Sequence, residues 1–124
     1  MIFYTDKEHI NRTFMQFIVI GRDGTDEKAK ERRLATRPAH LKLGDELVIS
    51  GNMWYGAALW DDKNEMIGSM LLMDFLSKKE LQEWLDREPY VTGGVWKSVE
   101  ILKCNVRNPW QFNRPKEFYT EKQK

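Results

Sequence analysis

The first clear pattern is an apolar, β-branched run from Thr13 to Arg22 (TFMQFIVIGR), which ends at the turn signal Asp23-Gly24. A run of this kind, bounded by a turn, predicts a strand. The segment from Thr25 to about Ala35 is rich in helix formers and predicts a helix. Because Pro38 lacks a backbone donor and restrains the residue before it, we expect this helix to end or kink near Arg37, with a fresh turn after it.

The middle and the end of the chain supply the other strands. Glu46 to Met53 (ELVISGNM) predicts a second strand. Gly56 to Trp60 and Glu65 to Phe75 predict a hairpin about the polar turn Asp61 to Asn64. Val95 to Val106 predicts the last long strand.

A second helix is predicted to follow Ser77. The segment Ser77 to Glu80 has capping-box spacing, and the helix should continue to about Arg87, before Pro89. One apolar face of this helix contains Leu81, Trp84 and Leu85. The element order is then β-α-β-β-α-β. It predicts an α+β fold of the ferredoxin-like type, in which a four-stranded antiparallel sheet carries two helices on one face.

The chain has 124 residues, which fit one domain with one core. We expect the core to span about residues 14–106. Residues 1–12 predict a short N-terminal addition. Residues 107–124, which contain two prolines and several aromatic side chains, predict an arm that packs on another surface.

Two strands suggest that both faces of the sheet are covered. Phe17 to Ile20 and Met70 to Met73 are nearly continuous apolar runs, whereas a strand with one wet face alternates apolar and polar residues. The chain is too short to supply a second layer, so we expect a two-fold homodimer through the sheet faces. The alternative is that the aromatic C-terminal arm folds back across the open face.

Charge and composition narrow the functional classes. Lys and Arg number 20 against 19 Asp and Glu, so the chain lacks the basic surplus typical of nucleic-acid or anionic-membrane binding. RNA-recognition domains share the element order, but their aromatic strand motif is missing here. No apolar run is long enough for a membrane helix, and the N-terminus does not resemble a signal peptide, so we expect a cytoplasmic location.

Few side chains are suited to bind a metal or a cofactor. Cys104 is the single cysteine, which excludes an internal disulfide and a cysteine-based zinc site. The two histidines, His9 and His40, have no ligand spacing between them. The Gly93-Gly94 pair lacks the lysine and helix of a phosphate loop. We therefore expect neither a metal nor a cofactor.

Several short motifs occur together along the chain. They are Arg37 to Leu41 (RPAHL), Ser50 to Asn52 (SGN), Gly68-Ser69, Phe75 to Ser77 before a helix with Trp84, and Glu88 to Val95 (EPYVTGGV). In combination they resemble the YCII-related (YciI-like) family of the dimeric α+β barrel superfamily. The resemblance extends from Phe14 to about Val106.

This resemblance implies a ferredoxin-like fold, a dimer formed through the sheet faces and a catalytic pair. In the family, a histidine of the first helical region is paired with the acidic residue of an Asp-Pro-Tyr motif. The matching positions here are His40 and Glu88. Glu88 has one methylene more than the family's aspartate, and the turn at Ser50 to Asn52 departs from the usual Gly-Gly-Pro. The carboxylate position and the pocket shape are therefore open.

His40 is the side chain best suited to acid–base chemistry, because imidazole both accepts and donates a proton near neutral pH. A carboxylate on its other ring nitrogen would fix the tautomer. If His40 lies in a first helical turn after Pro38, the helix dipole would also disfavour the charged ring. The alternative is a partly buried helix residue bonded to a backbone carbonyl.

Other side chains are candidates for binding a ligand. They are Arg37, Gly51, Trp54, Ser69, Tyr90 and Trp96. Arg37 would anchor a carboxylate, and Ser69 would donate to a substrate oxygen. The aromatic residues would line an apolar pocket, although each candidate also has an ordinary structural interpretation as solvated, turn, core or interface residue.

Two functional hypotheses follow from these residues. The first is an isomerase or lyase that transfers a proton on a small cyclic or aromatic oxygenated compound, with His40 and Glu88 as its acid–base pair. The second is a non-catalytic dimeric module that binds a small ligand or a protein in the same cleft.

Overall fold

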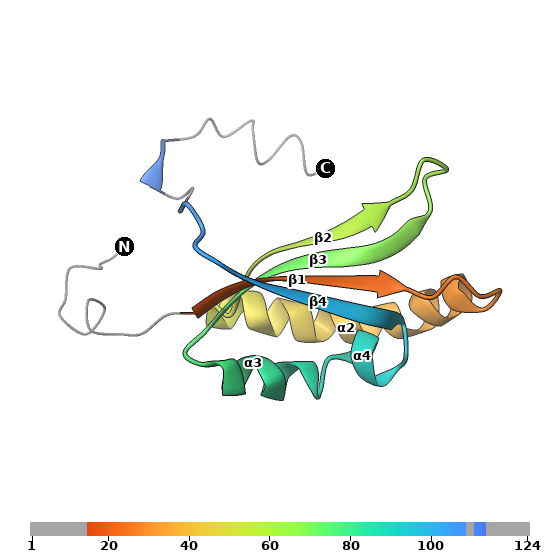
Figure 1. Ribbon diagram of the computed structural model, residues 1–124, viewed down its shortest axis with the longest axis horizontal. Helices are drawn as coiled ribbons and strands as arrows, with labels where there is room; N and C mark the ends of the chain where they lie inside the picture. The colour runs from red at the N-terminus through yellow and green to blue at the C-terminus, as the bar shows by residue number, and fades with distance from the viewer. Residues whose placement is uncertain (1–14, 109–110, 114–124) are drawn as a thin grey trace.

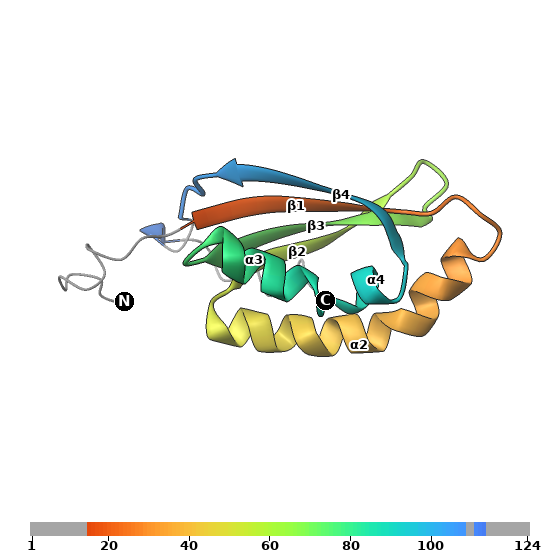
Figure 2. The same ribbon diagram turned by 60° about the horizontal axis from the view of Figure 1, so that its bottom comes forward.

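The computed structural model describes residues 15–108 and 111–113. Four strands form one antiparallel sheet in the order β2-β3-β1-β4, and the helices lie on one side of it (Figures 1 and 2). In chain order the elements are β1 (Met15–Asp23), α2 (Ala29–Ser50), β2 (Met53–Trp60), β3 (Met66–Phe75), α3 (Lys78–Leu85), α4 (Pro89–Thr92) and β4 (Trp96–Cys104). The predicted α+β, ferredoxin-like fold is confirmed, with α4 as a short additional helix.

The long helix α2 corrects two expectations. It continues through Pro38 without a break and includes residues 46–50, where the sequence predicts a strand. Its buried residues include Arg33, His40 and Leu47, which are spaced seven apart and so lie on one face. Pro38 is on the exposed side, where water can solvate the carbonyl group that loses its helical partner. Packing of the buried face therefore outweighs the local effect of the proline.

The helix α2 ends at Gly51, and β2 begins two residues later. Gly51 has a φ of 88°, and its N–H donates to the carbonyl of Val48. This left-handed conformation favours glycine and is a common helix C-terminus. The hairpin between β2 and β3 lies where the sequence predicts it, and Asp61 accepts hydrogen bonds from the backbone of Lys63 and Glu65 in its turn.

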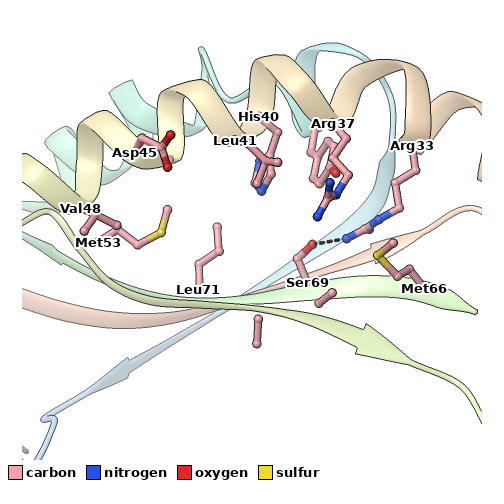
Figure 3. A pocket seen from close by; sticks show the side chains of 15 residues that line it. Arg33, Arg37, His40, Leu41, Asp45, Val48, Met53, Met66, Ser69 and Leu71 are labelled. Atoms are coloured by element: carbon pink, nitrogen blue, oxygen red, sulfur yellow. Dashed lines mark hydrogen bonds between the residues drawn. The ribbon is translucent and has the colours of Figure 1, made fainter. Parts of the chain in front are cut away.

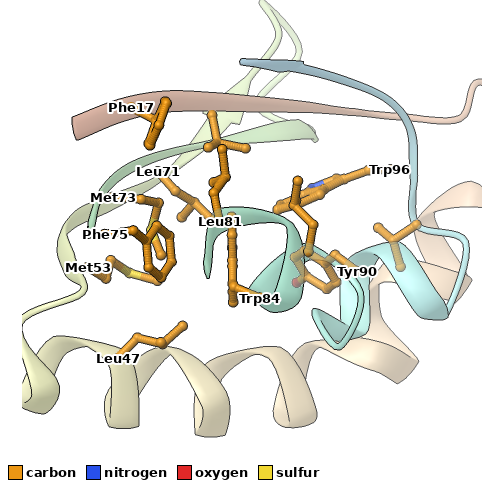
Figure 4. Close-up of a cluster of buried hydrophobic side chains, with 13 residues drawn as sticks. Phe17, Leu47, Met53, Leu71, Met73, Phe75, Leu81, Trp84, Tyr90 and Trp96 are labelled. Atoms are coloured by element: carbon orange, nitrogen blue, oxygen red, sulfur yellow. The ribbon is translucent and has the colours of Figure 1, made fainter. Parts of the chain in front are cut away.

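The apolar core lies between the sheet and the helices (Figure 4). Val19 in β1 and Met73 in β3 are fully buried on the face that the helices cover. The helix α3 begins as predicted, with the Ser77 hydroxyl accepting from the N–H of Glu80, and it buries its predicted apolar face. The main members of the cluster are Phe17, Leu47, Met53, Met73, Phe75, Leu81, Trp84, Leu85 and Trp96.

The opposite face of the sheet is also apolar. Ile18 pairs with Leu72 and Leu102, and Ile20 pairs with Met70. Directly paired residues point to the same side of a sheet, so these five side chains share the face away from the helices. None of the described helices covers this face (Figure 1).

The two predicted end segments of the chain fall largely outside the residues that the structure describes. The predicted N-terminal addition (1–12) and most of the predicted C-terminal arm (107–124) lie outside the described residues.

Within residues 15–108 and 111–113, none of the helices combines the length and apolar character that crossing a bilayer requires.

Candidate functional site

The structure brings His40 and Glu88 into direct contact, although 48 residues separate them along the chain. Nδ1 of His40 lies 2.7 Å from Oε2 of Glu88. The Glu88 side chain is fully buried and that of His40 is 11% exposed. The longer side chain of glutamate therefore reaches the imidazole ring at hydrogen-bond distance.

Two helices hold this pair. His40 is on the buried face of α2, and Glu88 is the residue before α4. The same Oε2 of Glu88 accepts from the backbone N–H of Tyr90, so the carboxylate also caps α4. Pro89 at the first helical position and an acceptor before it are typical of a helix start. The motif Glu88-Pro89-Tyr90 thus fixes the carboxylate through local backbone geometry.

The hydrogen bonds of Glu88 bear on which nitrogen of His40 carries the proton. When Glu88 is ionised, its carboxylate only accepts hydrogen bonds, as its Oε2 does from the N–H of Tyr90. Nδ1 of His40 must therefore donate, which leaves Nε2 without a proton in the neutral ring. A lone pair on Nε2 is what a general base requires.

Aromatic rings enclose the imidazole. The ring of Tyr90 stacks on His40 at 3.8 Å with an angle of 7° between their planes. Trp96 meets His40 edge-on at 6.1 Å and Tyr90 edge-on at 5.6 Å. Burial raises the pKa of the Tyr90 hydroxyl, because desolvation of the phenolate outweighs the attraction of nearby Arg33 and Arg37. Tyr90 is thus a neutral wall of the site.

A buried ionic network that the sequence interpretation missed lies beside these rings. Nη1 of Arg33 donates to both carboxylate oxygens of Asp23 at 2.9 Å, and both side chains are 5% exposed. Nη2 of Arg33 donates to Oγ of Ser69 at 3.1 Å, and the guanidinium lies 4.9 Å from the centre of the Tyr90 ring. The spacing of seven between Arg33 and His40 is the signal that places both on one helix face.

The residues open onto a cavity of about 330 Å³ between α2 and the strands β2 and β3. Figure 3 shows His40 midway along its helical wall, with Arg33 and Arg37 toward one end and Asp45 toward the other. Ser69 lies on the sheet side, next to Arg33. The apolar part of the lining comes from Leu41, Val48, Met53, Met66, Leu71 and the β2 residues Gly56 to Ala58. The cavity is therefore apolar with polar groups at defined places, as ligand sites usually are.

The binding candidates from the sequence divide into three groups. Arg37, Ser69 and Tyr90 line the cavity. Trp96 is behind it and donates from Nε1 to Oγ of Ser69 at 3.4 Å. Gly51 and Trp54 are not among the lining residues, and Gly51 has a structural role at the end of α2.

The expectation that His40 lies in a first helical turn, where the helix dipole would disfavour its charged ring, is wrong. His40 is in the interior of α2, which starts at Ala29, so Pro38 does not create a helix N-terminus. Its contact with Glu88 also replaces the alternative of a bond to a backbone carbonyl. In the described part of the chain, no three His, Cys, Asp or Glu side chains gather closely enough to hold a metal ion.

The fold and the site define a ferredoxin-like α+β domain with a histidine–carboxylate pair at a cavity. Residues 15–105 match the model of the YCII-related domain. This chain belongs to the YCII-related family.

The proteins similar to this chain include two relatives and a solved structure. Protein YciI of Escherichia coli O6:H1 and Protein YciI of Shigella flexneri are each 32% identical over 93 residues, which cover 70% of this chain and 93% of the relative. The solved structure is 5-chloro-2-hydroxyhydroquinone dehydrochlorinase from Burkholderia phenoliruptrix AC1100, in complex with 2,5-dihydroxybenzoquinone. It is 18% identical with a TM-score of 0.62, over 80% of this chain and 100% of that chain. At this identity, the likeness concerns the fold.

Proposed function

We propose that this protein transfers a proton on a small cyclic or aromatic compound that carries oxygen, as an isomerase or a lyase. The observation that supports the proposal most is the 2.7 Å contact between Nδ1 of His40 and Oε2 of Glu88 at a cavity. In the reaction, Nε2 of His40 takes the proton, and Glu88 stabilises the imidazolium that forms. The stacked ring of Tyr90 holds the imidazole in place.

Burial supports a catalytic role for Glu88 over a purely structural one. Its side chain is fully buried, and its Oε1 has no hydrogen-bond partner among the described residues. A buried carboxylate oxygen without a partner costs free energy, so a fold-only role would favour a smaller or neutral cap. A catalytic pair gives a reason to keep the charge.

Arg37 is proposed to hold an anionic group of the ligand. It is exposed on the cavity wall, and among the described residues it has no ion-pair partner. Its guanidinium can donate two parallel hydrogen bonds to the two oxygens of a carboxylate, or donate to the single oxygen of a phenolate. Asp45, toward the other end of the cavity, would repel an anion there (Figure 3). These two charges would orient the ligand.

The homodimer remains part of the proposal. The apolar face of Ile18, Ile20, Met70, Leu72 and Leu102 is the surface we propose for the second copy. Sedimentation equilibrium measures this directly. A chain that stays monomeric at micromolar concentration would contradict it.

The experiment that tests the function compares the wild type with His40→Asn. A panel of hydroxylated ring ketones and quinones, beginning with 2,5-dihydroxybenzoquinone, is incubated in deuterium oxide and followed by NMR for deuterium incorporation or conversion. We expect the wild type to act on a member of the panel. His40→Asn keeps an N–H that can face Glu88 but has no Nε2, so its rate should fall by about 10²–10⁴-fold.

A second function stays open for the same cavity. A non-catalytic dimeric module would bind a small ligand or a protein there, and the glutamate where the family has aspartate favours this alternative. Binding of a panel compound that survives in His40→Asn, with neither exchange nor conversion by the wild type, would replace the enzymatic proposal by this one. An unchanged rate in His40→Asn would reject His40 as the base.

A further inference from the structure

The hydrogen bonds around Ser69 fix the direction of its hydroxyl proton. Oγ of Ser69 accepts from Nη2 of Arg33 at 3.1 Å and from Nε1 of Trp96 at 3.4 Å. A guanidinium and an indole nitrogen can only donate, and a hydroxyl oxygen has two acceptor positions. Both acceptor positions of Ser69 are therefore occupied, and its O–H must donate elsewhere.

The remaining direction leads to the cavity. Ser69 is 2% exposed and lines the cavity together with His40 and Tyr90. Within residues 15–108 and 111–113, Ser69 has no acceptor for its own proton. A buried donor without a partner costs free energy that a ligand oxygen would recover.

We propose that Ser69 donates a hydrogen bond to a carbonyl or enolate oxygen of the ligand, which makes ring and aryl ketones and their enolate forms the substrate class. A ligand that presented an N–H without a lone pair at this position would oppose one donor with another. The site would thus select acceptor oxygens there. The claim about the reaction rests on the proposed function, whereas the claim about binding rests on the Ser69 contacts.

The two groups divide the reaction between them. Nε2 of His40 takes a proton from the carbon next to the carbonyl, the electron pair of the broken C–H bond forms the new C=C bond, and the carbonyl π electrons move to its oxygen. Ser69 donates to that oxygen as its negative charge develops. The Arg33 guanidinium donates to Ser69 in turn, which polarises the hydroxyl and strengthens it as a donor.

The experiment uses acetophenone and α-methylstyrene, two aromatic compounds of nearly equal size that differ by a C=O against a C=CH₂ group. Binding of each is measured by NMR titration with the wild type and with Ser69→Ala. Loss of one hydrogen bond should weaken acetophenone binding by about tenfold in Ser69→Ala. Binding of α-methylstyrene should change by less than about twofold, because it has no acceptor oxygen.

A second measurement detects the hydrogen bond spectroscopically, first in the wild type and then in two variants. The infrared carbonyl band of bound acetophenone should lie at lower frequency with the wild type than in an aprotic solvent. The shift should be lost in Ser69→Ala and kept in His40→Asn. No acetophenone binding to the wild type, an unshifted carbonyl band, or equal losses for both compounds would overturn the proposal. A shifted band together with full deuterium exchange in His40→Asn would reject only the role of His40.

Discussion

The layer between α2 and the sheet has two ends of opposite character. At the end near Leu47, the side chains of Met73, Phe75 and Trp84 form a buried apolar cluster. At the other end, the space between helix and sheet holds an Arg33–Asp23 ion pair, the His40–Glu88 pair and a cavity. The same helix α2 and the same sheet line both ends, whereas α3 completes the apolar end and α4 the polar end.

The comparison indicates what each end contributes. Apolar burial is roughly proportional to area and tolerates exchange of one apolar residue for another of similar size. Buried charges contribute little net stability and depend on each partner being present. The apolar end therefore holds the fold together, whereas we propose that the polar end is retained for the chemistry of the site.

The largest effect is expected from breaking the ion pair at the polar end. Arg33→Met leaves the Asp23 carboxylate buried without its partner and should lower the free energy of unfolding by about 3–5 kcal/mol. The double variant Arg33→Met, Asp23→Leu removes both charges and should recover most of this loss. Urea unfolding measures the free energy of unfolding of both variants. A double variant as unstable as the single one would mean that the ion pair itself holds the fold.

A smaller effect is expected where the polar end is packed most tightly. A Cβ at Gly21 would lie 2.2 Å from Cδ2 of Trp96, so Gly21→Ala must displace the indole that donates to Ser69. This overpacking should lower the free energy of unfolding by about 1–3 kcal/mol.

Gly44→Ala is the matched control for that change. Gly44 is in the interior of α2, and its Cβ would lie 3.8 Å from Cε of Met53, which is an ordinary van der Waals contact. It should therefore stabilise the protein by about 0.4–1 kcal/mol. Equal effects of the two substitutions in thermal unfolding would contradict the packing argument.

The smallest effect is expected at the exposed start of α2, outside both ends. Hydrogen bonds from Arg32 hold the pKa of Asp26 at about 2, below its ordinary value of 3.8. A lowered folded-state pKa contributes stability above the ordinary pKa, and this contribution is lost as the pH falls toward 2. Asp26→Asn should therefore lower the Tm by about 1–3 °C at pH 6, with the difference vanishing near pH 2. The same change at exposed Asp62 is the control, and a Tm difference that does not depend on pH would contradict the interpretation.

The sequence predicts most of the fold because the strands and α3 follow clear local patterns. It fails at residues 46–50, where Val48 and Ile49 suggest a strand although both are exposed on α2. Their β-branched shape is a weak preference, and it yields to the seven-residue spacing that buries Arg33, His40 and Leu47. Tertiary packing decides the helix, and local patterns do not report it.

The candidate site is harder to predict from the sequence than the fold is. The pairing of His40 with Glu88 was predicted only from the resemblance to a family, because no sequence pattern relates two residues 48 positions apart. Arg33 and Asp23 were missed because charged side chains are ordinarily exposed, and only the fold reveals that these two are buried together. The local motif Glu88-Pro89-Tyr90 is a helix start, which the sequence interpretation took only as the end of α3.

The central claim is that Glu88 holds His40 with a lone pair of Nε2 available to the cavity. Long-range proton–nitrogen NMR of the ¹⁵N-labelled protein measures this tautomer directly. For the neutral ring, we predict a protonated Nδ1 and an unprotonated Nε2, and a change of this pattern in Glu88→Gln. A neutral ring protonated at Nε2 in the wild type would contradict the account.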